Sequence, residues 1–311
     1  MYPERVGKIM LDASMPPVPE SLTVSKGQGM AMTQAFGHLE RLCLEQPRKY
    51  CSSFDTQNDK TLTDQWLNLT KTIRAGKLTA TTNMTNSQGD YVQFPLTIGL
   101  VQGYLMAKMV DPNFPGVFTI IQKLTEGSEE QIIEILNFCC NLTVYGETYM
   151  VQTWYTYGVC VGEASVGRSF MPSTAILAQD YSGRFAVAQA MQAYREFKST
   201  WNDAMATSGF VAMFSVLSSW TAEAVPAQPG FRAGIKALVL GNLYDPETPF
   251  IWSNHMRESL PDGAMIIWQG GGHGEQRDDD NMKDCTDAID RFWETGRLPK
   301  DGLTCRTPKF K

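Results

Sequence analysis

Three segments of the chain combine a short apolar run with a polar turn, which is typical of buried parallel strands. They are residues 6–14 (VGKIMLDAS), 236–245 (KALVLGNLYD) and 264–272 (AMIIWQGGG). Residues 246–263 begin with proline, place apolar residues at helical spacing and end in Pro-Asp-Gly, which predicts a helix. Residues 278–296 begin with acidic residues and end in glycine, which predicts a second helix. This alternation predicts parallel strands joined by crossover helices, and therefore an α/β fold.

The long middle of the chain has a helical periodicity instead. Its apolar residues recur at helical spacing, between short breaks, in residues 32–46, 61–76, 94–110, 116–127, 128–140 and 186–201. A mostly helical segment inserted into an α/β core is typical of a cap that covers a substrate site. We therefore divide the chain into a core strand segment at 1–18, a helical cap or lid at 19–232, and a C-terminal core at 233–311.

Two polar residues follow predicted strands at the edge where open α/β sheets place their ligands. Asp245 ends the strand of 236–245, and His273 follows the strand of 264–272. A carboxylate there can accept the imidazole Nδ1–H, fix the tautomer and stabilise the imidazolium that forms in general-base catalysis. The glycines beside His273 allow a sharp turn and leave the ring uncovered. From the residues alone, His273 fits a catalytic base and an ordinary loop histidine equally well.

Composition narrows the classes of partner. The net charge is −6 and the isoelectric point is about 5.2, so no basic face is evident for a nucleic acid. No apolar run approaches the roughly 18 residues that span a bilayer. The chain has three histidines and no Cys-x-x-Cys pair, which argues against a metal site. We expect no metal, no cofactor, no nucleic acid and no membrane partner.

Seven cysteines raise the question of the redox compartment. The close pairs Cys43/Cys51 and Cys285/Cys305 favour disulfides in an exported protein, and the alternative is small buried thiols in a cytosolic one. Three glycosylation sequons, at Asn68, Asn83 and Asn141, fit export, but chance alone would give nearly as many. The chain begins with neither the basic nor the apolar region of a signal peptide, so we expect upstream sequence to be missing.

Longer motifs carry a family resemblance. GNLYDPETP followed by WQGGGHGEQ resembles the acid and histidine loops of the α/β-hydrolases, in the order acid then histidine. The tail CTDAIDRFWETGRLPKDGLTC resembles the end of secreted tripeptidyl aminopeptidases and related proline-iminopeptidase-like serine hydrolases. YPERVGKIMLDAS resembles the segment after the nucleophile helix in that family. FGHLERLCLEQPRKYC and DPNFPGVFTIIQKLTEGSEEQIIEIL resemble parts of its cap. The likeness is strong at 1–20 and 233–305 and looser between them.

This resemblance implies a serine hydrolase that cleaves short peptides from their amino ends with a Ser-His-Asp triad. Asp245 would be the triad acid and His273 the base. Disulfides would join Cys285 to Cys305 and Cys43 to Cys51. His38 and His255 match no catalytic position, so we assign them structural roles. The implied fold is the C-terminal portion of a secreted α/β-hydrolase with a helical cap. Its partners would be a small peptide or ester substrate and the missing N-terminal hydrolase segment.

The nucleophile departs from the family pattern. The family's serine lies in a Gly-x-Ser-x-Gly elbow just before the point where this chain begins, so the elbow is absent, together with one oxyanion N–H. GEASVG offers Ser165 as a weaker alternative, but Glu163 stands where the elbow needs glycine. We therefore expect the chain alone to be inactive. The alternatives are a catalytically inactive cap-domain binding protein and an esterase.

The cysteine near that serine is also irregular. Cys160 fits the family's cap-to-core segment, but Gly162 stands where the family has an acid, and the usual partner cysteine is missing. Cys160 therefore pairs with Cys139 or Cys140, or it stays free. The missing acid weakens any inference that a substrate's free amine is recognised there.

Overall fold

The computed structural model describes residues 5–51, 61–81, 84–85, 91–92, 96–110, 115–144, 181–201, 234–274 and 282–305. Within them lies a four-stranded sheet whose order is β1-β4-β5-β6 and whose strands are all parallel. The strands are β1 (Ile9–Asp12), β4 (Ala237–Tyr244), β5 (Gly263–Gly271) and β6 (Leu303–Cys305). Crossover helices α11 (Phe250–Glu258) and α12 (Lys283–Thr295) connect the last three strands. The predicted α/β fold with parallel strands is confirmed.

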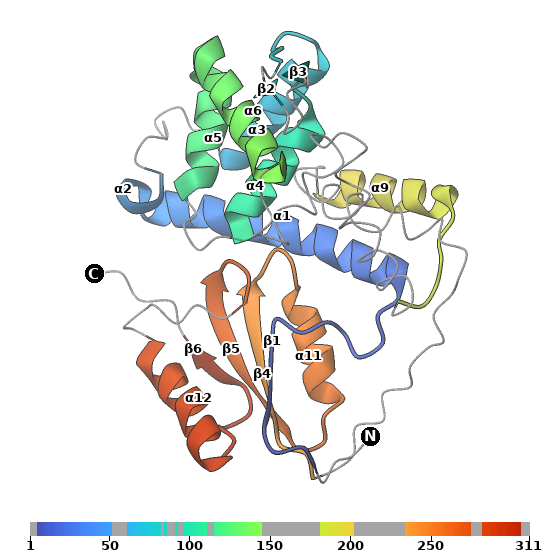
Figure 1. The fold of residues 1–311 in the computed structure, drawn as a ribbon, viewed down its shortest axis with the longest axis vertical. Helices are drawn as coiled ribbons and strands as arrows, with labels where there is room; N and C mark the ends of the chain where they lie inside the picture. The colour runs from blue at the N-terminus through green and yellow to red at the C-terminus, as the bar shows by residue number, and fades with distance from the viewer. Residues whose placement is uncertain are drawn as a thin grey trace.

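The two crossover helices cover opposite faces of the sheet (Figure 1). Leu238 and Leu240 of β4 pack with residues of α12, whereas Ala237 and Val239 pack with Phe250 and other residues near α11. Successive side chains of a strand point to opposite faces, so both faces of β4 are buried and its sequence is apolar throughout. This is why the strand reads as a continuous apolar run.

The segment between β1 and β4 is largely helical where it is described. It contains α1 (Ser21–Glu45), α2 (Pro47–Tyr50), α3 (Leu62–Arg74), α4 (Ile98–Val110), α5 (Pro115–Glu126), α6 (Glu129–Val144) and α9 (Val187–Trp201). A short antiparallel pair, β2 (Met84–Thr85) and β3 (Tyr91–Val92), lies between α3 and α4. Helix α1 crosses above the sheet, and α3, α5 and α6 lie on the far side of α1 (Figure 1). These helices share a core around Phe36, Trp66 and Phe118. The proposed boundaries at 1–18, 19–232 and 233–311 remain a prediction, because 145–180 and 202–233 lie outside the described residues.

Helix α1 begins earlier than the sequence pattern predicts, at Ser21 rather than residue 32. Glu20 caps its start by accepting hydrogen bonds from the backbone N–H groups of Leu22 and Thr23. Glycine ordinarily disfavours a helix, but a Cβ on Gly27 would lie 2.9 Å from the indole Nε1 of Trp252. Close packing against α11 therefore explains this glycine inside a helix.

Two disulfides join the cysteine pairs expected from the sequence. Cys43 and Cys51 have Cα atoms 5.5 Å apart, and Cys285 and Cys305 have Cα atoms 5.8 Å apart. The second disulfide ties α12 to β6. Cys160 lies outside the described residues, so its pairing remains open. No helix in the described part of the chain is long and apolar enough to cross a membrane.

We expect the Cys285–Cys305 disulfide to be present in the purified protein, because its cysteines are buried and already in bonding geometry. Proteolysis without reduction should yield one linked peptide that separates into two after reduction, as read by mass spectrometry. The Cys43–Cys51 peptide is the internal comparison. Two free thiols at 285 and 305 would contradict the disulfide and remove the argument for an oxidising compartment.

Candidate functional site

The structure brings Asp245 and His273 together at the carboxyl ends of β4 and β5. Asp245 directly follows β4, and His273 lies just beyond β5. The imidazole Nδ1 is 3.1 Å from Asp245 Oδ2 and 3.2 Å from Oδ1, which is hydrogen-bond distance. Parallel neighbouring strands end at the same edge, so residues far apart in the sequence meet there. Their catalytic role remains a prediction.

The carboxylate of Asp245 is held by four further donors. Oδ1 accepts the backbone N–H groups of Glu247 and Thr248, each at 2.8 Å. Oδ2 accepts the Thr248 hydroxyl and the backbone N–H of Gly274, each at 2.9 Å. Asp245 is only 2% exposed. Hydrogen bonds of this kind fix the orientation of the carboxylate toward the imidazole.

The loop that carries His273 is fixed on both sides. Gly272 and Gly274 have φ values of 90° and 72°, in the left-handed region that favours glycine. Asn242 donates through Nδ2 to the carbonyl oxygen of Gly272 at 2.8 Å. The N–H of His273 donates to the carbonyl oxygen of Val110, the last residue of α4, at 3.0 Å. The ring is therefore held by its backbone as well as by Asp245.

The second ring nitrogen faces another acid. With Nδ1–H donated to Asp245, Nε2 is the edge available for proton transfer. Glu247 Oε2 lies 3.8 Å from that Nε2. The side chain of His273 is 28% exposed and that of Glu247 is 17% exposed. The imidazole therefore lies between two carboxylates.

These neighbours set the charge of the site. Burial disfavours the imidazolium, but the hydrogen bond to Asp245 and the charges of Asp245, Glu247 and Asp12 outweigh burial and raise the pKa of His273 to about 9. Burial raises the pKa of Glu247 to about 7; the charge of His273 opposes that change and the charge of Asp245 adds to it. The site as it stands favours a protonated His273 at neutral pH.

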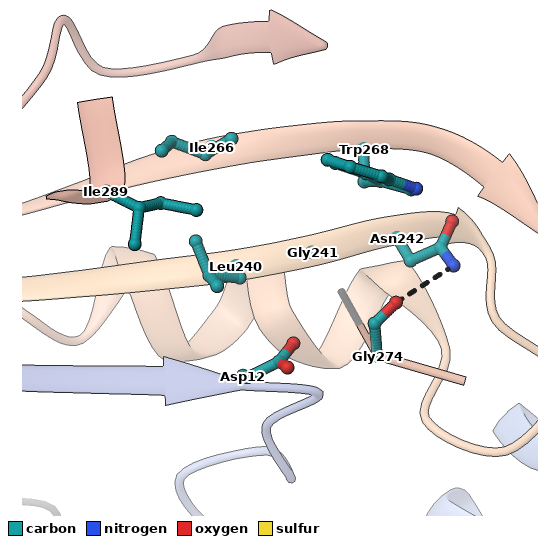
Figure 2. Close-up of a pocket in the computed structure, with 8 residues that line it drawn as sticks. All are labelled: Asp12, Leu240, Gly241, Asn242, Ile266, Trp268, Gly274 and Ile289. Atoms are coloured by element: carbon teal, nitrogen blue, oxygen red, sulfur yellow. Dashed lines mark hydrogen bonds between the residues drawn. The ribbon is translucent and has the colours of Figure 1, made fainter. Parts of the chain in front are cut away.

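A small pocket lies beside this pair on the α12 side of the sheet (Figure 2). Its lining is mostly apolar: Asp12, Leu240, Gly241, Asn242, Ile266, Trp268, Gly274 and Ile289. The carboxylate of Asp12, at the end of β1, points toward Gly274 (Figure 2). A Cβ on Gly274 would lie 3.3 Å from Asp12 Oδ2, so glycine also serves this close approach.

A stacked pair of aromatic rings joins helix α1 to the end of β4, next to Asp245. His38 of α1 stacks on Tyr244, the last residue of β4, with centroids 3.7 Å apart and planes 3° apart. Arg41 donates through Nη2 to His38 Nδ1 at 2.8 Å and to the Tyr244 hydroxyl at 2.7 Å. Burial and the Arg41 charge lower the pKa of His38 to about 4. His38 is thus neutral at neutral pH and packs on Tyr244, the residue that directly precedes Asp245.

Two other residues were singled out in the sequence. Ser165 lies outside the described residues, and His255 is exposed on α11. Sequence reasoning did not identify Asp12 or Glu247. Their only signals were an acid at the end of the first strand and an acid two positions after Asp245. Among the described residues, no group of three or more His, Cys, Asp or Glu side chains could hold a metal ion.

The parallel sheet and the acid–histidine pair at its carboxyl edge are features of the α/β-hydrolase class. Residues 205–305 match a family model described as "TAP-like protein", which covers both loops of the pair and the Cys285–Cys305 disulfide. The match supports a TAP-like α/β-hydrolase region and hydrolase activity in general. No curated protein matches the chain.

Proposed function

We propose that the chain carries the acid and base of a secreted serine hydrolase that cleaves short peptides from their amino ends, as tripeptidyl and prolyl aminopeptidases do. The proposal is supported by the Asp245–His273 contact inside the region that matches the TAP-like family model. The two disulfides fit an oxidising compartment. The peptidase specificity comes from the family resemblance.

In the proposed reaction, a serine hydroxyl attacks the peptide carbonyl and His273 Nε2 takes the hydroxyl proton. Asp245 holds Nδ1–H and stabilises the imidazolium. His273 then gives the proton to the leaving amine, and a water repeats the sequence to release the acyl product. Asp245 and His273 supply neither the serine nor the N–H groups of the oxyanion hole, so other residues would have to provide them. Ser165 stays the weaker candidate nucleophile in this chain.

The helical segment would act as the cap of this site. Helix α4 reaches the His273 loop through the carbonyl of Val110, and α1 reaches the acid loop through Gln28, whose Nε2 donates to the carbonyl oxygen of Glu247 at 3.1 Å. Helices in these positions limit access to the carboxyl edge. We propose that they select short substrates.

The experiment compares the chain of 311 residues with the same chain extended by any in-frame coding sequence upstream of Met1. Each is assayed with a peptidyl anilide, a chromogenic ester and a fluorophosphonate probe. We expect the chain alone to be silent, because Glu163 stands where a nucleophile elbow around Ser165 would need glycine. We expect the extended protein to cleave the anilide, with loss of activity in His273→Ala and no loss in the matched variant His255→Ala.

Several outcomes discriminate between the functions. Turnover that survives His273→Ala would refute the proposed role of the pair. Labelling or turnover of the 311-residue chain that Ser165→Ala abolishes would assign the nucleophile to Ser165. Cleavage of the ester alone would favour an esterase, and silence of both proteins would favour the inactive binding protein.

A further inference from the structure

We infer that Glu247 is a positioning residue that engages the Nε2 edge of His273, so that the nucleophile or substrate must displace its carboxylate before His273 can accept a proton. The inference rests on the proposed function and concerns the regulation of the same site. If it is correct, Glu247 stabilises the imidazolium and raises the pH at which His273 begins to act as a base.

The backbone of Glu247 is fixed from two directions. Its N–H donates to Asp245 Oδ1 at 2.8 Å, and its carbonyl oxygen accepts Gln28 Nε2 at 3.1 Å. The first contact belongs to the acid loop and the second to helix α1. The Glu247 side chain therefore starts from a defined position beside the imidazole.

The carboxylate of Glu247 has one opposite charge within reach among the described residues. Its Oε2 is buried and makes no hydrogen bond in the described part of the chain, and it forms an ion pair with His273 Nε2 at 3.8 Å. A buried carboxylate oxygen without a hydrogen bond is unfavourable, so the imidazolium charge offsets part of that cost. At 3.8 Å the contact is electrostatic, and displacing it breaks no hydrogen bond.

Three acidic side chains act on the imidazole ring of His273. Asp245 and Glu247 reach it from the loop after β4, and Asp12 acts on it from the end of β1. The Val110 carbonyl oxygen of helix α4 accepts the backbone N–H of His273, and α1 contacts Glu247 through the uncharged Gln28. The raised pKa of His273, about 9, agrees with this arrangement. With Nε2 protonated, His273 is positively charged beside Glu247 and cannot take a proton from a hydroxyl.

Glu247→Gln tests this directly, because glutamine keeps the shape of the side chain and removes its charge. The chain has three histidines, so the imidazole signals can be assigned by single substitutions and followed by NMR as the pH is varied. We expect the His273 titration midpoint to fall by about one pH unit, as for loss of one nearby opposite charge. The matched control, Glu294→Gln on the exposed face of α12, should leave the midpoint unchanged.

A second variant guards against disruption of the loop. Glu247→Asp keeps the charge and withdraws it by one methylene, so it should lower the midpoint less than Glu247→Gln does. In a protein active toward the peptidyl anilide, kcat/KM is also measured as a function of pH. The acid limb of that profile should shift to lower pH by as much as the NMR midpoint does. A residue that only supports the fold would change stability without moving that limb.

The results separate the two proposals. If Asp245→Asn lowers the His273 midpoint and Glu247→Gln does not, the acid–histidine pair stands and the role of Glu247 is refuted. If the midpoint in the unsubstituted chain lies at the ordinary histidine value, the role of Glu247 is refuted as well. If Asp245→Asn leaves the midpoint unchanged, the pair itself fails, and with it the proposed function.

Discussion

Replacing Asp245 by alanine is expected to lower the free energy of unfolding by about 3–5 kcal/mol, the range for removing one partner of a buried charged contact. The carboxylate is almost fully buried and accepts the N–H groups of Glu247, Thr248 and Gly274 as well as the Thr248 hydroxyl. Alanine leaves these donors and Nδ1 of His273 without their acceptor. Each unsatisfied buried group adds to the loss.

Urea denaturation at neutral pH measures this loss. Asp290→Ala, an exposed aspartate on α12, is the matched control and should change stability by no more than about 0.5 kcal/mol. The loss of stability in Asp245→Asn should lie between the losses in Asp245→Ala and Asp290→Ala, because the asparagine oxygen can still accept some of the N–H groups. A loss below about 1 kcal/mol for Asp245→Ala would mean that water replaces the carboxylate as acceptor, contrary to the burial of Asp245.

The sequence predicted three of the four strands, and missed the short β6, because burial leaves a clear apolar run only in longer strands. β4 and β5 are nearly all apolar, and proline or glycine marks the turns around α11. The same reasoning located Asp245 and His273, because a residue that follows a parallel strand must lie at the carboxyl edge. To predict that Asp245 and His273 lie close together, it was enough to locate the ends of the two strands that they follow.

The contacts around His273 depended on features that periodicity does not encode. The register shifts between Asn242 and Tyr244, which changes how the end of β4 aligns with β5. Side-chain direction in the following turn brings Glu247 to Nε2, and the end of β1 brings Asp12 toward Gly274. These placements depend on tertiary geometry, so the sequence showed only that acids occur nearby.

The start of α1 shows a similar limit. Gly27 suggests a break in a helix when read locally, and only the indole of Trp252 explains why a larger residue would not fit. The sequence assigned His38 a structural role, but its ring stack on Tyr244 joins positions that no local pattern connects. Through Tyr244, Gln28 and Val110, the helices contact both loops of the candidate site. We therefore expect changes in this contact region to affect stability and the site together.

Acidification is expected to weaken the fold through His38. In the folded chain the pKa of His38 is lowered from 6.5 to about 4, first by burial and then by the charge of Arg41. A base with a lowered pKa contributes stability that is complete above the unfolded pKa of 6.5 and is lost as the pH falls through about 4. The lowering corresponds to about 3 kcal/mol of stability lost across that window.

His38→Phe should remove most of this acid-dependent loss. Phenylalanine can keep the stack on Tyr244 but cannot be protonated, while Arg41 keeps its hydrogen bond to the Tyr244 hydroxyl. Urea denaturation at neutral pH and near pH 4 should therefore show a smaller drop in the variant, by about 3 kcal/mol, than in the unsubstituted chain. The control is His255→Phe on the exposed face of α11, which should keep the full drop. Equal drops in His38→Phe and the unsubstituted chain would place the acid sensitivity in the carboxylates, because protonation of His38 would then not oppose folding.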